Sequence, residues 1–146
     1  MHILVINGPN LNLLGTREPE VYGTLSLKNI EDGLRAGFQQ VAFTFFQSNH
    51  EGAIIDKLQA AQSEKVDGIV LNAAAYTHYS YAIRDAIAAI PIPVIEVHIS
   101  NILTREEFRK HSVTAPVCKA QISGFGTDGY RIAVDTLIEH SSSPTQ

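Results

Sequence analysis

Residues 68–98 read GIVLNAAAYTHYSYAIRDAIAAIPIPVIEVH, with an amphipathic segment between two apolar runs. The runs 68–72 and 93–98 are short and rich in Ile and Val, which is typical of strands buried on both faces of a sheet. Between them, Ala82, Ile83, Ala86 and Ile87 recur at helical spacing. A strand, a crossover helix and a second strand form the unit from which parallel sheets are built. The stretch therefore predicts an α/β fold.

The same alternation extends to both ends of the chain. Residues 2–7, 41–47 and 119–123 form three more apolar runs of strand length. Apolar residues at helical spacing lie between them, at Leu27, Ile30, Leu34 and Phe38 and again at Ile54, Ile55, Leu58 and Ala61, and a last helix is expected from about residue 129. Five such units favour a flavodoxin-like, doubly wound parallel sheet of strand order 2-1-3-4-5 with helices on both faces.

Two helix starts have the spacing of a capping box, in which side chains satisfy free backbone N–H groups. They pair Ser48 with Glu51 and Thr104 with Glu107, and the second predicts a short helix over residues 104–111. We expect a single catalytic domain over residues 1–140 and a disordered tail over residues 141–146.

Composition narrows the classes of protein. A net charge of −4 without a run of Lys or Arg disfavours a nucleic-acid-binding surface. No apolar stretch reaches the roughly 20 residues that span a bilayer, and the first residues lack the pattern of a signal peptide. The one cysteine, Cys118, has apolar neighbours and is interpreted as a small core residue. We therefore expect a cytoplasmic protein with no membrane contact.

In such a fold ligands bind beyond the carboxyl ends of the strands. The segment 7–23, NGPNLNLLGTREPEVYG, follows the first strand and is far longer than the usual connection of about 2 to 6 residues. It carries Asn10, Asn12, Arg17 and Tyr22, so it is a candidate lid or binding segment. The alternative is a surface loop built from turn-forming Gly, Pro and Asn.

The strand 93–98 brings a carboxylate and an imidazole together. A period of two places Glu96, His98 and Ser100 on one face, and Asn72 ends the neighbouring strand. A carboxylate that accepts the imidazole N–H fixes its tautomer and stabilises the protonated ring, which suits a general acid. The alternatives are a structural polar pair and a metal site, although no cluster of ligands at metal-binding spacing supports the second.

Two further pairs are candidates for ligand contacts. His78 and Asp85 are seven residues apart, so one helix would place them on nearly the same face, as either a site or an interface stripe. Arg105 and Arg109 are four apart and could present two guanidinium groups on one side of the expected short helix. Pairing with Glu106 is the alternative for the arginines.

Several familiar motifs are absent from the sequence. It has no Gly-x-Gly-x-x-Gly, no Walker loop, no Gly-x-Ser-x-Gly and no paired aspartates after the first strand. None of the five lysines falls at the carboxyl end of an expected strand, so a Schiff-base mechanism lacks its nucleophile. A non-catalytic flavodoxin-like binding or signalling module is the rival interpretation, since fold alone does not determine function.

Four motifs taken together resemble the type II 3-dehydroquinate dehydratases. They are segment 7–23, QSNHEG at 47–52, NAAAYTH at 72–78 followed by IRD, and PVIEVHISNILTREEFRKHS at 93–112. The resemblance implies that Tyr22 is the base, that Arg17 activates it, and that His98 is the acid. It also implies that Glu96 orients His98 and that Asn10 holds a water near the enolate oxygen.

The resemblance further implies a substrate, 3-dehydroquinate, and an assembly of trimers grouped into a homododecamer. It implies neither a cofactor nor a metal. The substrate-binding positions that match are Asn72, His78, Asp85, Ile99, Ser100 and Arg109. Two positions depart from the commoner family pattern, Ala73 in place of proline and Tyr79 in place of threonine.

The implied base needs activation, because a free tyrosine has a pKa of about 10. Lowering that pKa to about 7 takes roughly 4 kcal/mol. One cation near 4 Å supplies about that much at an effective dielectric of ~20. Arg17 lies five residues before Tyr22 on the same loop and is the natural source of that charge.

Overall fold

The computed structural model describes residues 1–16, 20 and 24–141, and its centre is one parallel five-stranded sheet. The strand order β2-β1-β3-β4-β5 confirms the predicted doubly wound α/β fold. The strands are β1 (His2–Asn7), β2 (Ala42–Gln47), β3 (Gly68–Asn72), β4 (Val94–His98) and β5 (Ala120–Ser123). Three of them begin one residue later than the apolar run suggested. The expected tail lies, except for Ser141, outside the described residues.

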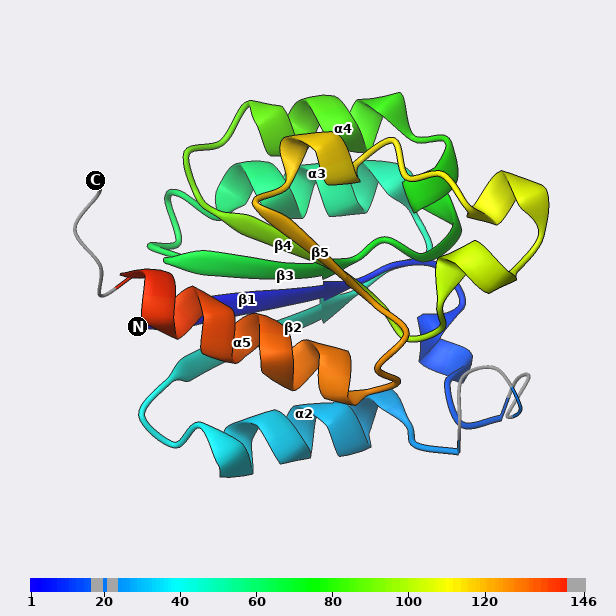
Figure 1. Ribbon diagram of the computed structural model, residues 1–146. Helices are drawn as coiled ribbons and strands as arrows, with labels where there is room; N and C mark the ends of the chain where they lie inside the picture. Colours follow the sequence, from blue (N-terminus) through cyan, green and yellow to red (C-terminus); the bar gives the residue numbers. More distant parts are fainter. Residues whose placement is uncertain (17–19, 21–23, 142–146) are drawn as a thin grey trace.

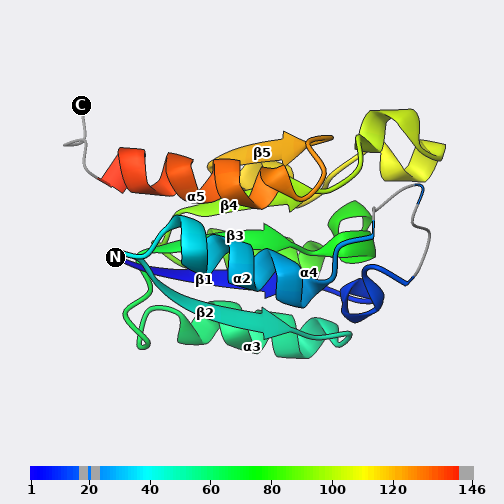
Figure 2. The same cartoon turned by 90° about the horizontal axis from the view of Figure 1, so that it is seen from below.

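Helices cover both faces of the sheet. Helices α3 (Glu51–Ala60) and α4 (Tyr81–Ala88) lie on one face, and α2 (Leu27–Gly37) and α5 (Asp128–Ser141) lie on the other (Figure 1). The view from below shows all strands pointing in one direction, away from the end where the N-terminus lies (Figure 2). No helix in the described part of the chain combines the length and the apolar character needed to span a bilayer.

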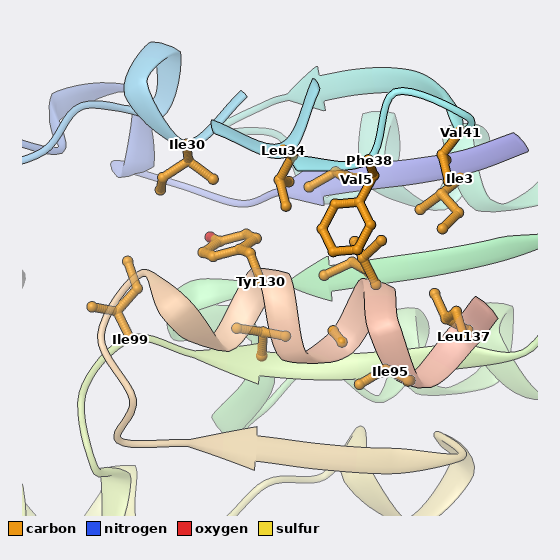
Figure 3. Close-up of a cluster of buried hydrophobic side chains, with 14 of the residues drawn as sticks. Ile3, Val5, Ile30, Leu34, Phe38, Val41, Ile95, Ile99, Tyr130 and Leu137 are labelled. Carbon is orange, nitrogen blue, oxygen red and sulfur yellow. The ribbon is translucent and has the colours of Figure 1, made fainter. Parts of the chain in front are cut away.

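Two apolar clusters form the core, one on each face of the sheet. Figure 3 shows the cluster between the sheet and helices α2 and α5, where Ile30 and Leu34 of α2 face Tyr130 of α5. The opposite cluster packs Ile54 and Leu58 of α3 against the sheet. Both faces of the central strands are therefore buried, which explains their continuous apolar runs.

Helix α3 begins differently from the prediction. His50 is its N-cap and supplies no side-chain bond, while the Ser48 hydroxyl accepts the His50 N–H at 3.0 Å. The Glu51 carboxylate instead accepts the Ser80 hydroxyl at 2.7 Å, and Ser80 caps α4. The predicted capping box is wrong because Glu51 bonds across to the next helix. A capping box does occur at the start of α2.

The expected helix over residues 104–111 is also wrong. Two 3₁₀ turns, η3 (Ile102–Thr104) and η4 (Glu107–Arg109), are separated by extended backbone at Arg105 and Glu106. The Thr104 hydroxyl donates to the Asn101 carbonyl at 2.9 Å, and the extended backbone at Arg105 leaves no helix for it to cap. Both turns lie at the carboxyl edge of the sheet (Figure 1).

Gly8 joins the first strand to the loop that carries Asn10. Its N–H donates to the Asn72 carbonyl at 2.8 Å, and a Cβ at Gly8 would lie 2.6 Å from the Ala73 carbonyl oxygen. That contact is with backbone, which cannot rotate away as a side chain could. Only glycine therefore allows the two loops to approach so closely.

We expect Gly8→Ala to lower the free energy of unfolding by about 1 to 3 kcal/mol, because the added methyl overpacks two backbone segments. Gly33→Ala is the matched control: Gly33 is exposed within α2 and an added Cβ meets nothing within 4 Å. It should raise stability by up to about 1 kcal/mol through helix propensity. Denaturant unfolding of both variants checks the pair, and equal effects would contradict this account of Gly8.

Candidate active site

A pocket opens at the carboxyl edge of the sheet, between η1 (Leu11–Leu13), η2 (Ala74–His78) and the η3–η4 segment. The described residues that line it are Pro9, Asn10, Leu11, Leu14, Asn72, Ala74, Ala75, His78, His98, Ile99, Ser100, Ile102, Arg105 and Arg109. Seven of the eleven predicted site residues are in this group, and none of the five lysines is. The fold therefore brings amide, imidazole and guanidinium groups together in one pocket.

Two hydrogen bonds fix the orientation of the Asn72 side-chain amide. Its Nδ2 donates to the Tyr130 hydroxyl at 2.9 Å, and its Oδ1 accepts the Ala74 N–H at 3.1 Å. The Tyr130 hydroxyl in turn donates to Asn7 Oδ1 at 2.5 Å. Burial raises the pKa of Tyr130, so its hydroxyl remains a neutral donor. One amide hydrogen of Asn72 is left to face the pocket.

His98 and Glu96 form a buried pair. The imidazole Nε2 lies 2.8 Å from a Glu96 carboxylate oxygen, and the Glu96 side chain has no solvent exposure. Burial by itself raises the pKa of Glu96, but bonds from His98, Thr114 and Gln121 outweigh it and hold that pKa below its ordinary value. An ionised Glu96 accepts the Nε2–H, so Nδ1 is the ring nitrogen available to a ligand.

His78 is the second imidazole of the pocket and is neutral at pH 7. Its Nδ1 donates to the His111 carbonyl at 2.8 Å, which leaves Nε2 as an acceptor. Burial lowers the pKa of His78, and the nearby charges of His98 and Arg109 lower it further. The rings of His78 and His98 lie 6.4 Å apart and nearly parallel. His78 therefore enters the pocket as a neutral acceptor.

Arg105 and Arg109 both face the pocket although no helix joins them. Arg109 Nε donates to Glu106 at 3.3 Å, and its guanidinium also lies over the Phe108 ring at 4.8 Å. Arg109 therefore pairs with Glu106 and lines the pocket at the same time. Two guanidinium groups suit a ligand carboxylate, which they can bind in a bidentate way.

His78 and Asp85 do not share a helix face, which corrects the expectation from their spacing. His78 ends η2, and the Ser80 side chain caps a new helix, α4, by accepting the Ile83 N–H at 3.0 Å. The break removes the helical register, so His78 lines the pocket while Asp85 is exposed on α4. Arg17 and Tyr22 lie outside the described residues.

Comparison with known proteins gives the family. The model of the class II dehydroquinases matches residues 1–138. The chain belongs to the class II dehydroquinase family. It is 59% identical over 139 residues to the 3-dehydroquinate dehydratase of Caldicellulosiruptor bescii, covering 94% of this chain and 96% of that one. It is 52% identical over 147 residues to the Bacillus subtilis 3-dehydroquinate dehydratase, covering 99% of each.

Solved structures agree with this dehydroquinase assignment. The type II dehydroquinase of Butyrivibrio crossotus superposes with a TM-score of 0.93 at 54% identity, covering 94% of this chain and 97% of that one. The Propionibacterium acnes type II dehydroquinase gives a TM-score of 0.90 at 38% identity, covering 94% and 96%. The chain is therefore a hydro-lyase of this family, and the rival signalling module is set aside.

The two departures in this dehydroquinase have different surroundings. Ala73 is fully buried and leads into Ala74, whose φ of 51° is a left-handed conformation that costs a residue with a Cβ about 1 kcal/mol. Tyr79 is 58% exposed and stacks edge-on against Tyr76. Neither side chain bonds to the Glu96–His98 pair.

Some parts of the site were not predicted from the sequence. The apolar lining residues Leu11, Leu14 and Ile102 carry no chemical signal that separates them from core. Ser112, Thr114 and Gln121 bond to Glu96, and only Gln121, a polar residue within an apolar strand, could have drawn attention. Among the described residues, no three His, Cys, Asp or Glu side chains could together hold a metal ion.

Proposed function

We propose that this chain converts 3-dehydroquinate to 3-dehydroshikimate with Tyr22 as base and His98 as acid. The observation that carries the proposal is the buried Glu96–His98 pair, which opens onto a pocket that also presents guanidinium and amide groups. Relatives at 52–59% identity are 3-dehydroquinate dehydratases. The mechanism needs neither metal nor cofactor.

In the reaction, Tyr22 removes a proton from the carbon beside the ketone, giving an enolate. Arg17 stabilises the phenolate before that step and the negative charge during it. Asn10 holds a water against the enolate oxygen. His98 Nδ1 then donates a proton to the departing hydroxyl, which leaves as water, and Glu96 stabilises the imidazolium that supplies the proton.

The remaining groups hold the substrate. Arg109 pairs with its carboxylate, because a guanidinium fork matches that geometry. Asn72, His78 and the backbone amides of Ile99 and Ser100 bond to its hydroxyl groups, each from the wall of the pocket. Asp85 contributes from a neighbouring subunit. The enzyme would then serve the shikimate pathway to aromatic amino acids, in the cytoplasm.

Incubation of the purified protein with 3-dehydroquinate tests the proposed activity. Chromatography against an authentic standard should identify 3-dehydroshikimate as the product, formed in proportion to protein concentration. Unchanged substrate after prolonged incubation with folded protein would refute it.

We expect the activity to survive borohydride. An imine intermediate would be trapped by reduction on a lysine, but no lysine lines the described pocket. Residual turnover after treatment with borohydride and substrate, together with the intact mass of the protein, is the measurement. Substrate-dependent inactivation with a mass gain on a lysine would contradict the enolate mechanism.

We expect the protein to form a particle of dodecamer size, built from trimers in which Asp85 reaches a neighbouring site. Asp85 is exposed on α4 and does not line the described pocket of its own chain, which supports a contact with a neighbouring site. Light scattering combined with chromatography measures the mass. A fully active monomer would exclude a shared site.

A further inference from the structure

The Glu96 carboxylate receives hydrogen bonds from three neutral side chains besides His98. Gln121 Nε2 donates to Glu96 Oε2 at 2.6 Å, and the Thr114 hydroxyl donates to Oε1. Ser112 Oγ lies 3.0 Å from Oε1 and 2.9 Å from Oε2. We call Ser112, Thr114 and Gln121 the donor cradle. It surrounds a side chain with no solvent exposure.

Three separate parts of the fold place the cradle. Gln121 is the register partner of Glu96 on the adjacent strand β5, so the two side chains share one face of the sheet. Ser112 and Thr114 lie in the segment before η5 (Ala115–Val117), where the Ser112 hydroxyl also accepts the Ala115 N–H at 2.9 Å. That segment is fixed to η2 by the bond from Val113 N–H to the Thr77 carbonyl.

Few charged groups compete with the cradle. The ion pairs among the described residues give Glu96 a single partner, His98. His78 from η2 is a neutral imidazole, and Arg109 from η4 acts on His78. Burial raises the pKa of the Cys118 thiol, two residues before β5, to about 12, so it carries no charge. Besides His98, the ionised Glu96 carboxylate is therefore stabilised mainly by hydrogen bonds from the uncharged donor cradle.

We propose that the donor cradle decides where the proton of the Glu96–His98 pair resides. Two coupled groups take up a proton as one unit, and its position depends on which group is the better base. Three donors make the carboxylate a weak base, so the proton stays on the imidazole. Ser112, Thr114 and Gln121 are thus positioning residues for the acid, an inference that rests on the proposed role of His98.

Removing donors should move the shared proton from His98 to Glu96, while the pair as a whole still takes up one proton. Each bond to a charged group is strong enough that its loss shifts the ratio of the two proton positions by about tenfold. A neutral imidazole beside a protonated Glu96 is a poor acid. Turnover should fall with the imidazolium population, while substrate binding changes little.

The test uses Thr114→Val, Gln121→Met and their combination, each of which keeps side-chain volume and removes a donor. Nitrogen NMR of histidine-labelled protein without substrate reports the fraction of His98 in the imidazolium form. Thr114→Ser keeps the hydroxyl and should rescue. Thr136→Val makes the same change on α5, where the threonine hydroxyl donates to the Ile132 carbonyl of its own helix at 2.8 Å, so it is the matched control.

We expect the imidazolium-to-neutral ratio of His98 to fall about tenfold in each single variant and further in the pair. Turnover should follow it, with the Michaelis constant within about threefold, and Thr136→Val should match wild type. Folded variants with an unchanged His98 signal would overturn the proposal. Gln121 is exposed, so its variant should fold even if Thr114→Val does not. An inactive wild type showing the expected signals would instead refute only the proposed function.

Discussion

Tyr22→Phe should give a folded protein whose dehydratase turnover is about a hundredfold to ten-thousandfold lower than that of wild type. The substitution removes only the phenolic oxygen and keeps the aromatic ring, so the proposed base is lost with the smallest change in side-chain shape. Steady-state kinetics and thermal unfolding measure the two effects separately. Tyr79→Phe, at a tyrosine that is 58% exposed, is the matched control and should retain turnover.

Arg17→Ala tests how the base is activated. Loss of the cation destabilises the phenolate, so the ascending limb of the turnover profile should move to higher pH as turnover falls. Arg17→Lys should restore part of the charge but not the planar donor geometry. Near-normal activity in Tyr22→Phe would mean that another residue is the base, whatever Arg17 does.

His98→Ala should lower turnover by about a hundredfold or more and change substrate affinity by less than about tenfold. An acid that acts in the transition state contributes chiefly to turnover, because the ground state does not need its proton. Turnover comes from kinetics and affinity from calorimetry with the substrate or a stable analogue. The expected pattern is a defect in turnover alone.

A control variant and a stability measurement show whether the loss of turnover in His98→Ala is specific. His140→Ala changes an exposed histidine in the last turn of α5 and should leave both quantities unchanged. The melting temperature of His98→Ala shows whether the buried Glu96, left without its partner, has destabilised the fold. A loss of affinity with normal turnover would reassign His98 to substrate binding.

The fold could be predicted because apolar periodicity is set by burial on both faces of the sheet. Runs such as 68–72 matched β3 fully, and only the starts at residues 41, 93 and 119 were one residue early. Pro93 cannot donate a backbone N–H to a neighbouring strand, which accounts for the start of β4 at Val94.

Helix capping could not be predicted from spacing, because Glu51 and Thr104 bond to partners other than the helix starts that the spacing suggested. Glu51 bonds to Ser80, 29 residues away, in place of its own helix start. The Thr104 hydroxyl bonds backwards to Asn101. Residue spacing shows only which hydrogen bonds a side chain could make to nearby backbone groups. Which bond forms depends on the other partners that the folded chain brings within reach.

In the site as well, spacing placed residues that are close in sequence but not those that are distant. Glu96 and His98 are two residues apart on one strand, so a period of two was enough to place them together. Tyr130 supports Asn72 from 58 residues away, and no pattern in the sequence marked it as a residue of the site. The hydroxyl that fixes Asn72 therefore became visible only when α5 was packed on the sheet.

The central claim, a dehydration that uses only this chain's own residues, is tested most directly by ultraviolet absorbance. The product is a conjugated enone, whereas the substrate has an isolated ketone. Protein treated with a strong chelator and then passed through a desalting column should still give a rapid absorbance rise with 3-dehydroquinate, at the untreated rate. No rise with folded protein, or a rise restored only by added metal, would contradict the claim.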